Sequence, residues 1–261
     1  MALKSKVLPS YRLLNGNVKM RLVSLMLSLV FSLLFSVNSM AAPSQCVILL
    51  HALARTSYSM SSMARYLQKA NYIVINQHYP TTRKSIKALA SEDVASMVSQ
   101  CQQYKPSKIH FVTHSIGGIV LRAYLKDYSL PNLGRVVMLA PPNHGSQLAD
   151  LLRHNLIYQI IAGPAGQELT TGPYSTPNTL SQSVSYDVGI IAGNFSFNPL
   201  MRAFFHEEND GKVPLSSTQI TGMKDFIVLP VSHMFMMSNT RVIKEVVHFL
   251  QNGTFNSSMS I

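Results

Sequence analysis

The chain has 261 residues, of which 47% are hydrophobic and 13% are charged, and it contains no Trp. Soluble proteins average roughly 25% charged residues, so this low share favours an exported or membrane-associated protein. The apolar content excludes intrinsic disorder, and the absence of a collagen period, heptad run or long repeat excludes fibrous and solenoid classes. A chain of this length accommodates one large α/β domain or two small ones.

The formal net charge of +11 arises partly from the first 41 residues, which hold five basic and no acidic side chains. The rest has 17 basic and 11 acidic residues, a net charge of +6. These basic residues are scattered, without an aromatic-interleaved stripe or a nucleic-acid-binding motif. We therefore expect no nucleic-acid partner.

The amino-terminal segment has the pattern of an export signal. Two basic residues precede the apolar run Leu22–Val37, which ends in the small-residue stretch Ser39–Ala41. As a helix this run would span roughly 24 Å, less than the ~30 Å of a hydrocarbon core. We predict a cleaved signal peptide at 1–41, or alternatively an uncleaved amino-terminal anchor. The remaining 42–261 is then exported, either periplasmic or secreted.

Cys46 and Cys101 are the two cysteines of the chain. An even number in an exported protein permits a disulfide. Cys46 begins a predicted strand and Cys101 lies near the end of a predicted helix, so both fall at the same edge of an α/β fold. A disulfide and two buried thiols both remain open.

Short runs rich in Val and Ile alternate with helical patterns along the chain. This alternation predicts an α/β fold with a mostly parallel sheet of about six strands and helices on both faces. The predicted strands are 47–50, 73–76, 109–113, 136–139, 188–192 and 227–229, and the predicted helices are 60–70, 85–104, 117–126 and 238–250.

One connection is much longer than the others and is predicted to be a lid-like insertion at 143–187. Connections of this length are usually functional. It contains an apolar helical stretch, Leu148–Ile161. Core packing and a lid over an apolar substrate are both consistent with that stretch. We expect no second domain.

The strongest motif surrounds Ser115. A β-branched strand leads into this serine, which two glycines and a helical pattern follow. A nucleophile elbow needs this context, because a sharp turn must lift the hydroxyl above the sheet between small neighbours. Gly117 satisfies the second small position, whereas Thr113 replaces the usual first glycine.

A serine nucleophile needs a base and an acid that orients it, in the chain order Ser, Asp or Glu, His for this fold. Asp210 and His233 each follow a late strand, at the sheet edge where open α/β sheets bind ligands. Asp210 is favoured over Glu207 and Glu208 because its Asn-Asp-Gly turn holds a short carboxylate rigidly. The predicted catalytic residues are Ser115, Asp210 and His233.

The oxyanion hole is predicted from two backbone N–H groups. Ile116 follows the nucleophile, and Leu53 lies in the loop after the first strand. Each donor contributes about 3 kcal/mol in enzymes of this type. We expect His51 and His114 to hold their loops by hydrogen bonds, and no metal or cofactor is implied.

At these motifs the sequence resembles the α/β-hydrolase superfamily, in particular bacterial lipase-like serine esterases. The resemblance implies a Ser–Asp–His mechanism without a cofactor. It departs from the family pattern at Ala52, where His-Gly is usual, and at Thr113. The matching segments are 49–53, 113–118, 140–146, 209–213 and 232–233.

We therefore expect a serine esterase that acts on a small-molecule or lipid ester. An acyltransferase or thioesterase on the same fold is the alternative, and a catalytically silent binding module is a third. Membrane contact is expected only through an uncleaved amino-terminal segment or a lipid substrate. The oligomeric state is left open.

Overall fold

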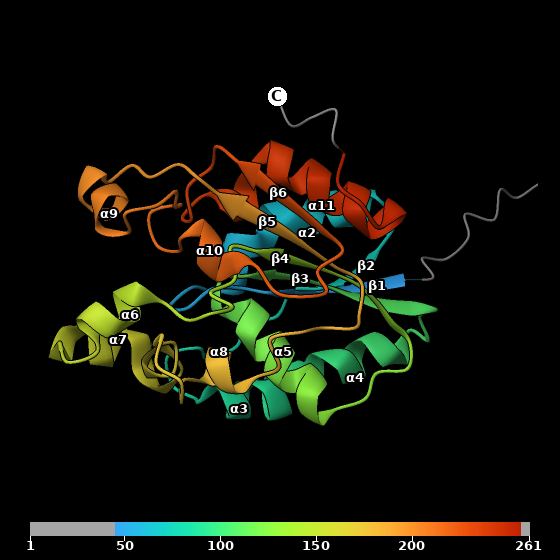
Figure 1. Ribbon diagram of the computed structural model, residues 1–261. Helices are drawn as coiled ribbons and strands as arrows, with labels where there is room; N and C mark the ends of the chain where they lie inside the picture. Colours follow the sequence, from blue (N-terminus) through green and yellow to red (C-terminus); the bar gives the residue numbers. More distant parts are fainter. Residues whose placement is uncertain (1–44, 257–261) are drawn as a thin grey trace, which may run out of the picture. The chain divides into compact units, whose positions relative to one another are not determined.

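The computed structural model describes residues 45–256, apart from the side chain of Arg202 (Figure 1). These residues belong to one structural unit. The predicted signal peptide or anchor, 1–41, lies outside the described residues. Within 45–256, no helix is both long and apolar enough to cross a membrane.

A six-stranded sheet forms the centre of this unit, and every pair of neighbouring strands is parallel. The strand order is β2-β1-β3-β4-β5-β6. Each predicted strand is present, so the predicted α/β class and parallel sheet are confirmed. The strands are β1 (Gln45–Leu50), β2 (Ile73–Ile75), β3 (Lys108–His114), β4 (Leu133–Leu139), β5 (Val188–Gly193) and β6 (Asp225–Leu229).

Along each strand, successive side chains pack alternately into two separate hydrophobic cores. In β1, Ile48 and Leu50 join one core whereas Val47 and Leu49 join the other, and all four are fully buried. Successive strand residues point to opposite faces, so a strand covered on both sides reads as a continuous apolar run. This is why the strands were visible in the sequence.

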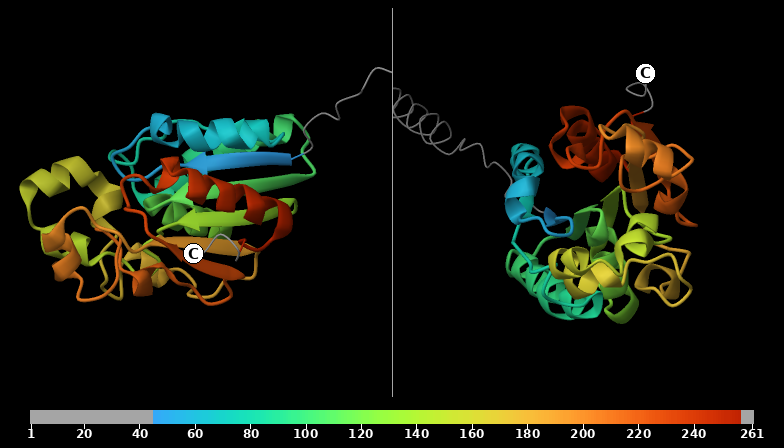
Figure 2. Two further views of the ribbon diagram at one scale, coloured as in Figure 1. Left: turned by 90° about the horizontal axis from the view of Figure 1, so that it is seen from above. Right: turned by 90° about the vertical axis from the view of Figure 1, so that its left-hand side faces the viewer.

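Helices cover both faces of the sheet. On one face, Figure 1 shows α3 (Ile86–Ala88), α4 (Ala95–Gln103) and α5 (Ile116–Asp127) below the strands. A π-helical segment, Leu89–Val94, joins α3 to α4, so the predicted helix 85–104 is one run with a local change of pitch. On the other face, α2 (Ser61–Lys69) packs beside α11 (Thr240–Asn252) (Figure 2).

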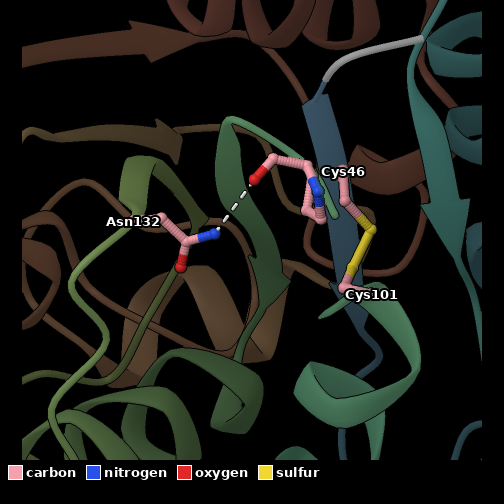
Figure 3. The surroundings of a disulfide bond; sticks show 4 residues. Cys46, Cys101 and Asn132 are labelled. Atoms are coloured by element: carbon pink, nitrogen blue, oxygen red, sulfur yellow. Dashed lines mark hydrogen bonds between the residues drawn. A yellow bond between two sulfur atoms is a disulfide. The ribbon is translucent and has the colours of Figure 1, made fainter. Parts of the chain in front are cut away.

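A disulfide links Cys46 at the start of β1 to Cys101 near the end of α4 (Figure 3). The two Cα atoms are 6.0 Å apart and the sequence separation is 55 residues. Beside it, the Asn132 amide donates to the carbonyl of Pro106 at 3.2 Å. Closing a loop of this length lowers the conformational entropy of the unfolded chain, which raises the free energy of unfolding by about 4 kcal/mol.

Several short helices gather beyond the carboxyl ends of the strands (Figures 1 and 2). Five apolar side chains of the predicted insertion are exposed there: Leu151, Leu156, Ile157, Ile160 and Ile161. Of the two interpretations of this stretch, core packing is therefore wrong for these five side chains. The helices there are α6 (Gln147–Leu152), α7 (Leu156–Gln167), α9 (Pro199–Phe204) and α10 (Leu215–Thr218), whereas α8 (Thr176–Thr179) lies below the sheet beside α5 (Figure 1).

Candidate active site

Ser115 occupies the sharp turn between β3 and α5. Its backbone has φ 56° and ψ −124°, a conformation that residues with a side chain rarely adopt. The Ser115 N–H donates to the Leu139 carbonyl of the neighbouring strand at 2.8 Å, which ties the turn to the sheet. The strand–turn–helix geometry expected from the sequence is therefore present at this serine.

Two positions near Ser115, two residues before and two residues after it, differ in whether the turn requires a small residue there. A Cβ atom at Gly117 would lie 2.7 Å from the carbonyl oxygen of Leu50, so only glycine fits there. At the other position, Thr113 is accommodated as a fully buried strand residue. Its hydroxyl has no hydrogen-bond partner among the described residues.

Asp210 is held by the tight turn that the Asn-Asp-Gly sequence predicts. The Asn209 side-chain oxygen accepts from the Gly211 N–H at 2.9 Å, and Gly211 has φ 93°. The Asp210 Oδ1 atom accepts from the N–H groups of Lys212 at 3.0 Å and Val213 at 2.8 Å. One carboxylate oxygen is thus fixed by the backbone, and the other is free to meet a partner.

That partner is His233, from the loop after β6. Its Nδ1 atom lies 2.7 Å from Asp210 Oδ2, and its backbone N–H donates to the Asp210 carbonyl at 3.0 Å. Both side chains are almost fully buried. Because the carboxylate can only accept, Nδ1 carries the proton of a neutral ring, and Nε2 is its basic nitrogen.

Gly193, the last residue of β5, makes room for this pair. A Cβ atom there would lie 2.3 Å from the Val231 carbonyl oxygen and 2.9 Å from the Asp210 Cβ. Gly193 was not among the residues predicted from the sequence. A glycine at the carboxyl end of the strand Val188–Gly193 was the signal that could have found it.

Ser115 and His233 line the same cavity, which has a volume of about 110 Å³. Asp210 lies behind His233, so the structure brings the three predicted catalytic residues to one place. Among the described residues, the Ser115 hydroxyl makes no hydrogen bond to His233.

The loop after β1 reaches the same cavity. Leu53, the predicted second oxyanion donor, lines it, and Ile116 follows Ser115 at the buried start of α5. The Ala54 N–H donates to the Thr81 hydroxyl at 3.1 Å, and the Arg55 N–H donates to the Ala52 carbonyl at 3.2 Å. These bonds hold the loop beside the serine.

His51 fixes the start of this loop, as the sequence analysis expected. Its Nε2 accepts from the Tyr79 N–H at 3.3 Å, so Nδ1 donates to the Ala52 carbonyl at 3.0 Å. The Tyr79 hydroxyl donates to the His51 carbonyl at 2.6 Å. Burial lowers the pKa of His51 to about 4, so this ring is neutral at pH 7.

His114 differs from that expectation. Neither of its ring nitrogens has a hydrogen-bond partner among the described residues, and the ring packs against His233 with centroids 4.8 Å apart. Burial, followed by electrostatic interaction with His233, Lys212 and Arg55, lowers the pKa of His114 well below its usual value. His114 is therefore a neutral wall of the His233 site.

The cavity lining extends beyond the residues assigned from the motifs. The insertion contributes apolar side chains, and two cations, Arg55 and Lys212, also face the cavity. Arg55 follows the oxyanion loop and Lys212 belongs to the Asn-Asp-Gly-Lys turn, so their positions beside motif residues were the available signals. The apolar lining from the insertion consists of Leu148, Ala149, Tyr158 and Leu169.

Solved structures with a similar fold include lipases and esterases. The mature Bacillus licheniformis lipase BlEst2 is 22% identical, with 82% of this chain and 92% of that chain covered and a TM-score of 0.65. The Legionella pneumophila phospholipase PlaB is 17% identical, with 83% and 61% covered and a TM-score of 0.65. A metagenomic carboxyl esterase is 18% identical, with 75% and 66% covered and a TM-score of 0.58.

At these identities the likeness shows the α/β-hydrolase fold alone. A search among curated proteins found no similar sequence. The sequence model of the palmitoyl protein thioesterase family, however, matches residues 46–184, more than half of the chain. The chain therefore belongs to the palmitoyl protein thioesterase family, and its fold is that of the α/β-hydrolases.

Proposed function

We propose that this protein is a serine hydrolase that cleaves carboxylic esters through Ser115, His233 and Asp210. The observation that carries the proposal is the buried 2.7 Å contact between His233 Nδ1 and Asp210 Oδ2, beside the cavity that Ser115 lines. An Asp–His pair beside a serine on a strained turn is an arrangement that activates a hydroxyl.

In the first half of the reaction, His233 Nε2 accepts the Ser115 proton while Oγ bonds to the carbonyl carbon of the substrate. The N–H groups of Leu53 and Ile116 stabilise the resulting oxyanion. The bond from carbon to the leaving oxygen or sulfur then breaks, and His233 returns the proton to the leaving group. Asp210 stabilises the imidazolium ring throughout and keeps its own charge.

In the second half, water replaces the leaving group. His233 accepts a proton from a water molecule while the oxygen of that water bonds to the acyl carbon. The acyl bond to Ser115 Oγ then breaks and His233 reprotonates the serine. The products are a carboxylic acid and the free alcohol or thiol, and no other co-reactant is consumed.

A thioester substrate is the second candidate, and the match to a palmitoyl protein thioesterase model favours it. An oxygen ester and a thioester of the same acyl chain, compared by kcat/KM, separate the two activities. An acyltransferase would instead form new esters when an acceptor alcohol is added to the assay. A silent binding module would hydrolyse neither substrate.

We also propose that 143–187 covers the acyl group as a lid-like insertion of the 42–261 hydrolase domain. Its apolar side chains on the cavity wall support this role. Export after removal of 1–41 is supported by the disulfide, because such bonds persist in oxidising compartments. The amino terminus of the protein recovered from cells tests cleavage against anchoring.

A fluorophosphonate probe tests the central proposal, because it bonds covalently only to an activated serine. We expect wild-type protein to be labelled and Ser115→Ala to remain unlabelled. Ser129→Ala, which removes a serine away from this cavity, is the matched control and should be labelled like wild type. Equal labelling of Ser115→Ala, or no labelling of folded wild type, would contradict the assignment.

A further inference from the structure

Three hollows of the surface meet at Arg55. This side chain lines the cavity that contains Ser115 and His233, a groove of about 500 Å³ beside α2, and a hollow of about 390 Å³ beside Arg83. Met234 lines both the cavity and the groove, so these two are neighbours. Arg55 therefore lies where a substrate would extend out of the site.

The lining of all three hollows is cationic. Arg55 and Lys212 line the cavity, Arg65 lines the groove, and Arg83 lines the third hollow, whereas no Asp or Glu lines any of them. The groove also presents several hydroxyl groups. They belong to Thr56, Tyr58, Ser59, Ser61, Ser62 and Ser238.

Arg55 has unused hydrogen-bonding capacity. Among the described residues, its guanidinium makes one hydrogen bond, a 3.1 Å contact from Nη2 to the Met234 sulfur, and no ion pair. A thioether is a weak acceptor, and a guanidinium carries five donors in a planar fork. That fork matches the paired oxygen atoms of a phosphate or carboxylate.

The position of His233 indicates which part of the substrate reaches Arg55. In the proposed reaction His233 must protonate the leaving atom, so the leaving group lies on the His233 side of the scissile bond. Met234 follows His233 and contacts Arg55 on that side. The insertion supplies the apolar wall for the acyl group with Leu148 and Tyr158.

We propose that Arg55 is a specificity-determining residue that binds an anionic leaving group, a phosphate-bearing alcohol or thiol. The groove beside α2 receives this group, and Lys212 adds positive charge on the cavity side. This inference rests on the proposed ester hydrolysis and names its substrate class. Arg55 recognises the departing half of the substrate and takes no part in bond breaking.

Two esters that differ only in whether the leaving group carries a phosphate test this proposal. They are 1-hexanoylglycerol and 1-hexanoylglycerol 3-phosphate, with kcat/KM measured from the acid released. We expect wild type to prefer the phosphate ester, and Arg55→Gln to reduce that preference by about tenfold, mainly through KM. Arg55→Lys should retain part of it, because a single positive charge remains.

Lys87→Gln removes one positive charge from an exposed helix position away from the groove and should leave the preference as in wild type. Added NaCl should lower the wild-type preference by screening, and this measurement does not depend on the folding of any variant. Hydrolysis of both esters with the same ratio in wild type and folded Arg55→Gln would overturn the role of Arg55. Failure to hydrolyse either ester would instead count against the esterase function.

Discussion

At the scale of single residues, Asp210 shows how a short turn prepares a catalytic group. Both of its carboxylate oxygens have assigned partners, since Oδ1 accepts two backbone N–H groups and Oδ2 faces His233. The carboxylate therefore cannot rotate without losing hydrogen bonds. This rigidity sets the tautomer of His233 before a substrate arrives.

Asp210→Asn should lower kcat by about 10³–10⁴-fold while leaving the fold intact. The amide can donate to His233 Nδ1, so the neutral ring would carry its proton on Nε2 and could not accept one from Ser115. Steady-state kinetics with a p-nitrophenyl ester would measure the loss. Glu207→Gln, three residues earlier, is the matched control, and a comparable loss there would point to a different acid.

Thr113→Val should raise the free energy of unfolding by about 1 kcal/mol. The threonine is fully buried and its hydroxyl has no partner among the described residues, so valine keeps the shape and removes the desolvation cost. Thermal unfolding measures the change. A lower Tm for the valine variant would mean that the hydroxyl is hydrogen-bonded in solution.

At the scale of the elements, α5 joins the nucleophile to the insertion. Arg122, on this helix, is buried and donates to Asn143 at both its carbonyl and its side-chain oxygen, at 3.1 and 3.0 Å. It also donates to the carbonyls of Pro177 at 3.3 Å and Ser181 at 2.9 Å. One guanidinium thus fastens two distant parts of the insertion to the helix that begins after Ser115.

Arg122→Leu should lower the free energy of unfolding by about 3 kcal/mol, because three buried oxygen atoms and one partly buried oxygen atom lose their donor. The insertion should then be cut by proteases within 143–187 earlier than the rest of the domain. Chemical denaturation and limited proteolysis measure both effects. Lys87→Leu is the exposed control, and equal behaviour of the two variants would show that Arg122 does not hold the insertion.

The helix α7 shows where sequence periodicity stops being informative. The spacing predicted one apolar helical stretch over Leu148–Ile161, and the structure divides it into α6 and the first turns of α7. Periodicity also does not say what an apolar face meets. The structure leaves Leu156, Ile157, Ile160 and Ile161 exposed. Gly163, with φ 60°, interrupts the helix, and a Cβ atom there would lie 1.9 Å from the Thr82 carbonyl oxygen. The exposed turns therefore precede a kink that local packing imposes.

At the scale of the whole molecule, much of the architecture was predictable because a doubly covered parallel sheet leaves continuous apolar runs in the sequence. The motifs at Ser115, Asp210 and His233 were visible because each combines a strand end with turn residues. Arg55 and Lys212 were not, since a cation lining a cavity has the same local sequence as a solvated one. The contact of His51 with Tyr79 likewise depends on the fold.

Stability should fall as the pH is lowered from about 6.5 to about 4. Burial lowers the pKa of both His51 and His110 to about 4, so the unfolded chain binds more protons than the folded one within this range. Within this pH range each of the two histidines lowers the free energy of unfolding by up to about 1.4 kcal/mol per pH unit. Above or below the range neither histidine lowers it further.

Thermal unfolding at pH 7 and pH 5 measures this dependence. His110→Gln removes one titrating ring, so its Tm should fall less between the two values than that of wild type. His248→Gln, at a helix surface position, is the control and should follow wild type. An equal fall in wild type and His110→Gln would show that His110 does not contribute.

The Cys46–Cys101 bond also has a consequence for the order in which the molecule is completed. Both cysteines precede Ser115 in the chain, as do β1 and the loop that carries Leu53. If the exported residues emerge in sequence order, the cross-link can form before the serine, aspartate and histidine have emerged. The segment that bears one oxyanion donor would then be cross-linked before the later strands assemble beside it.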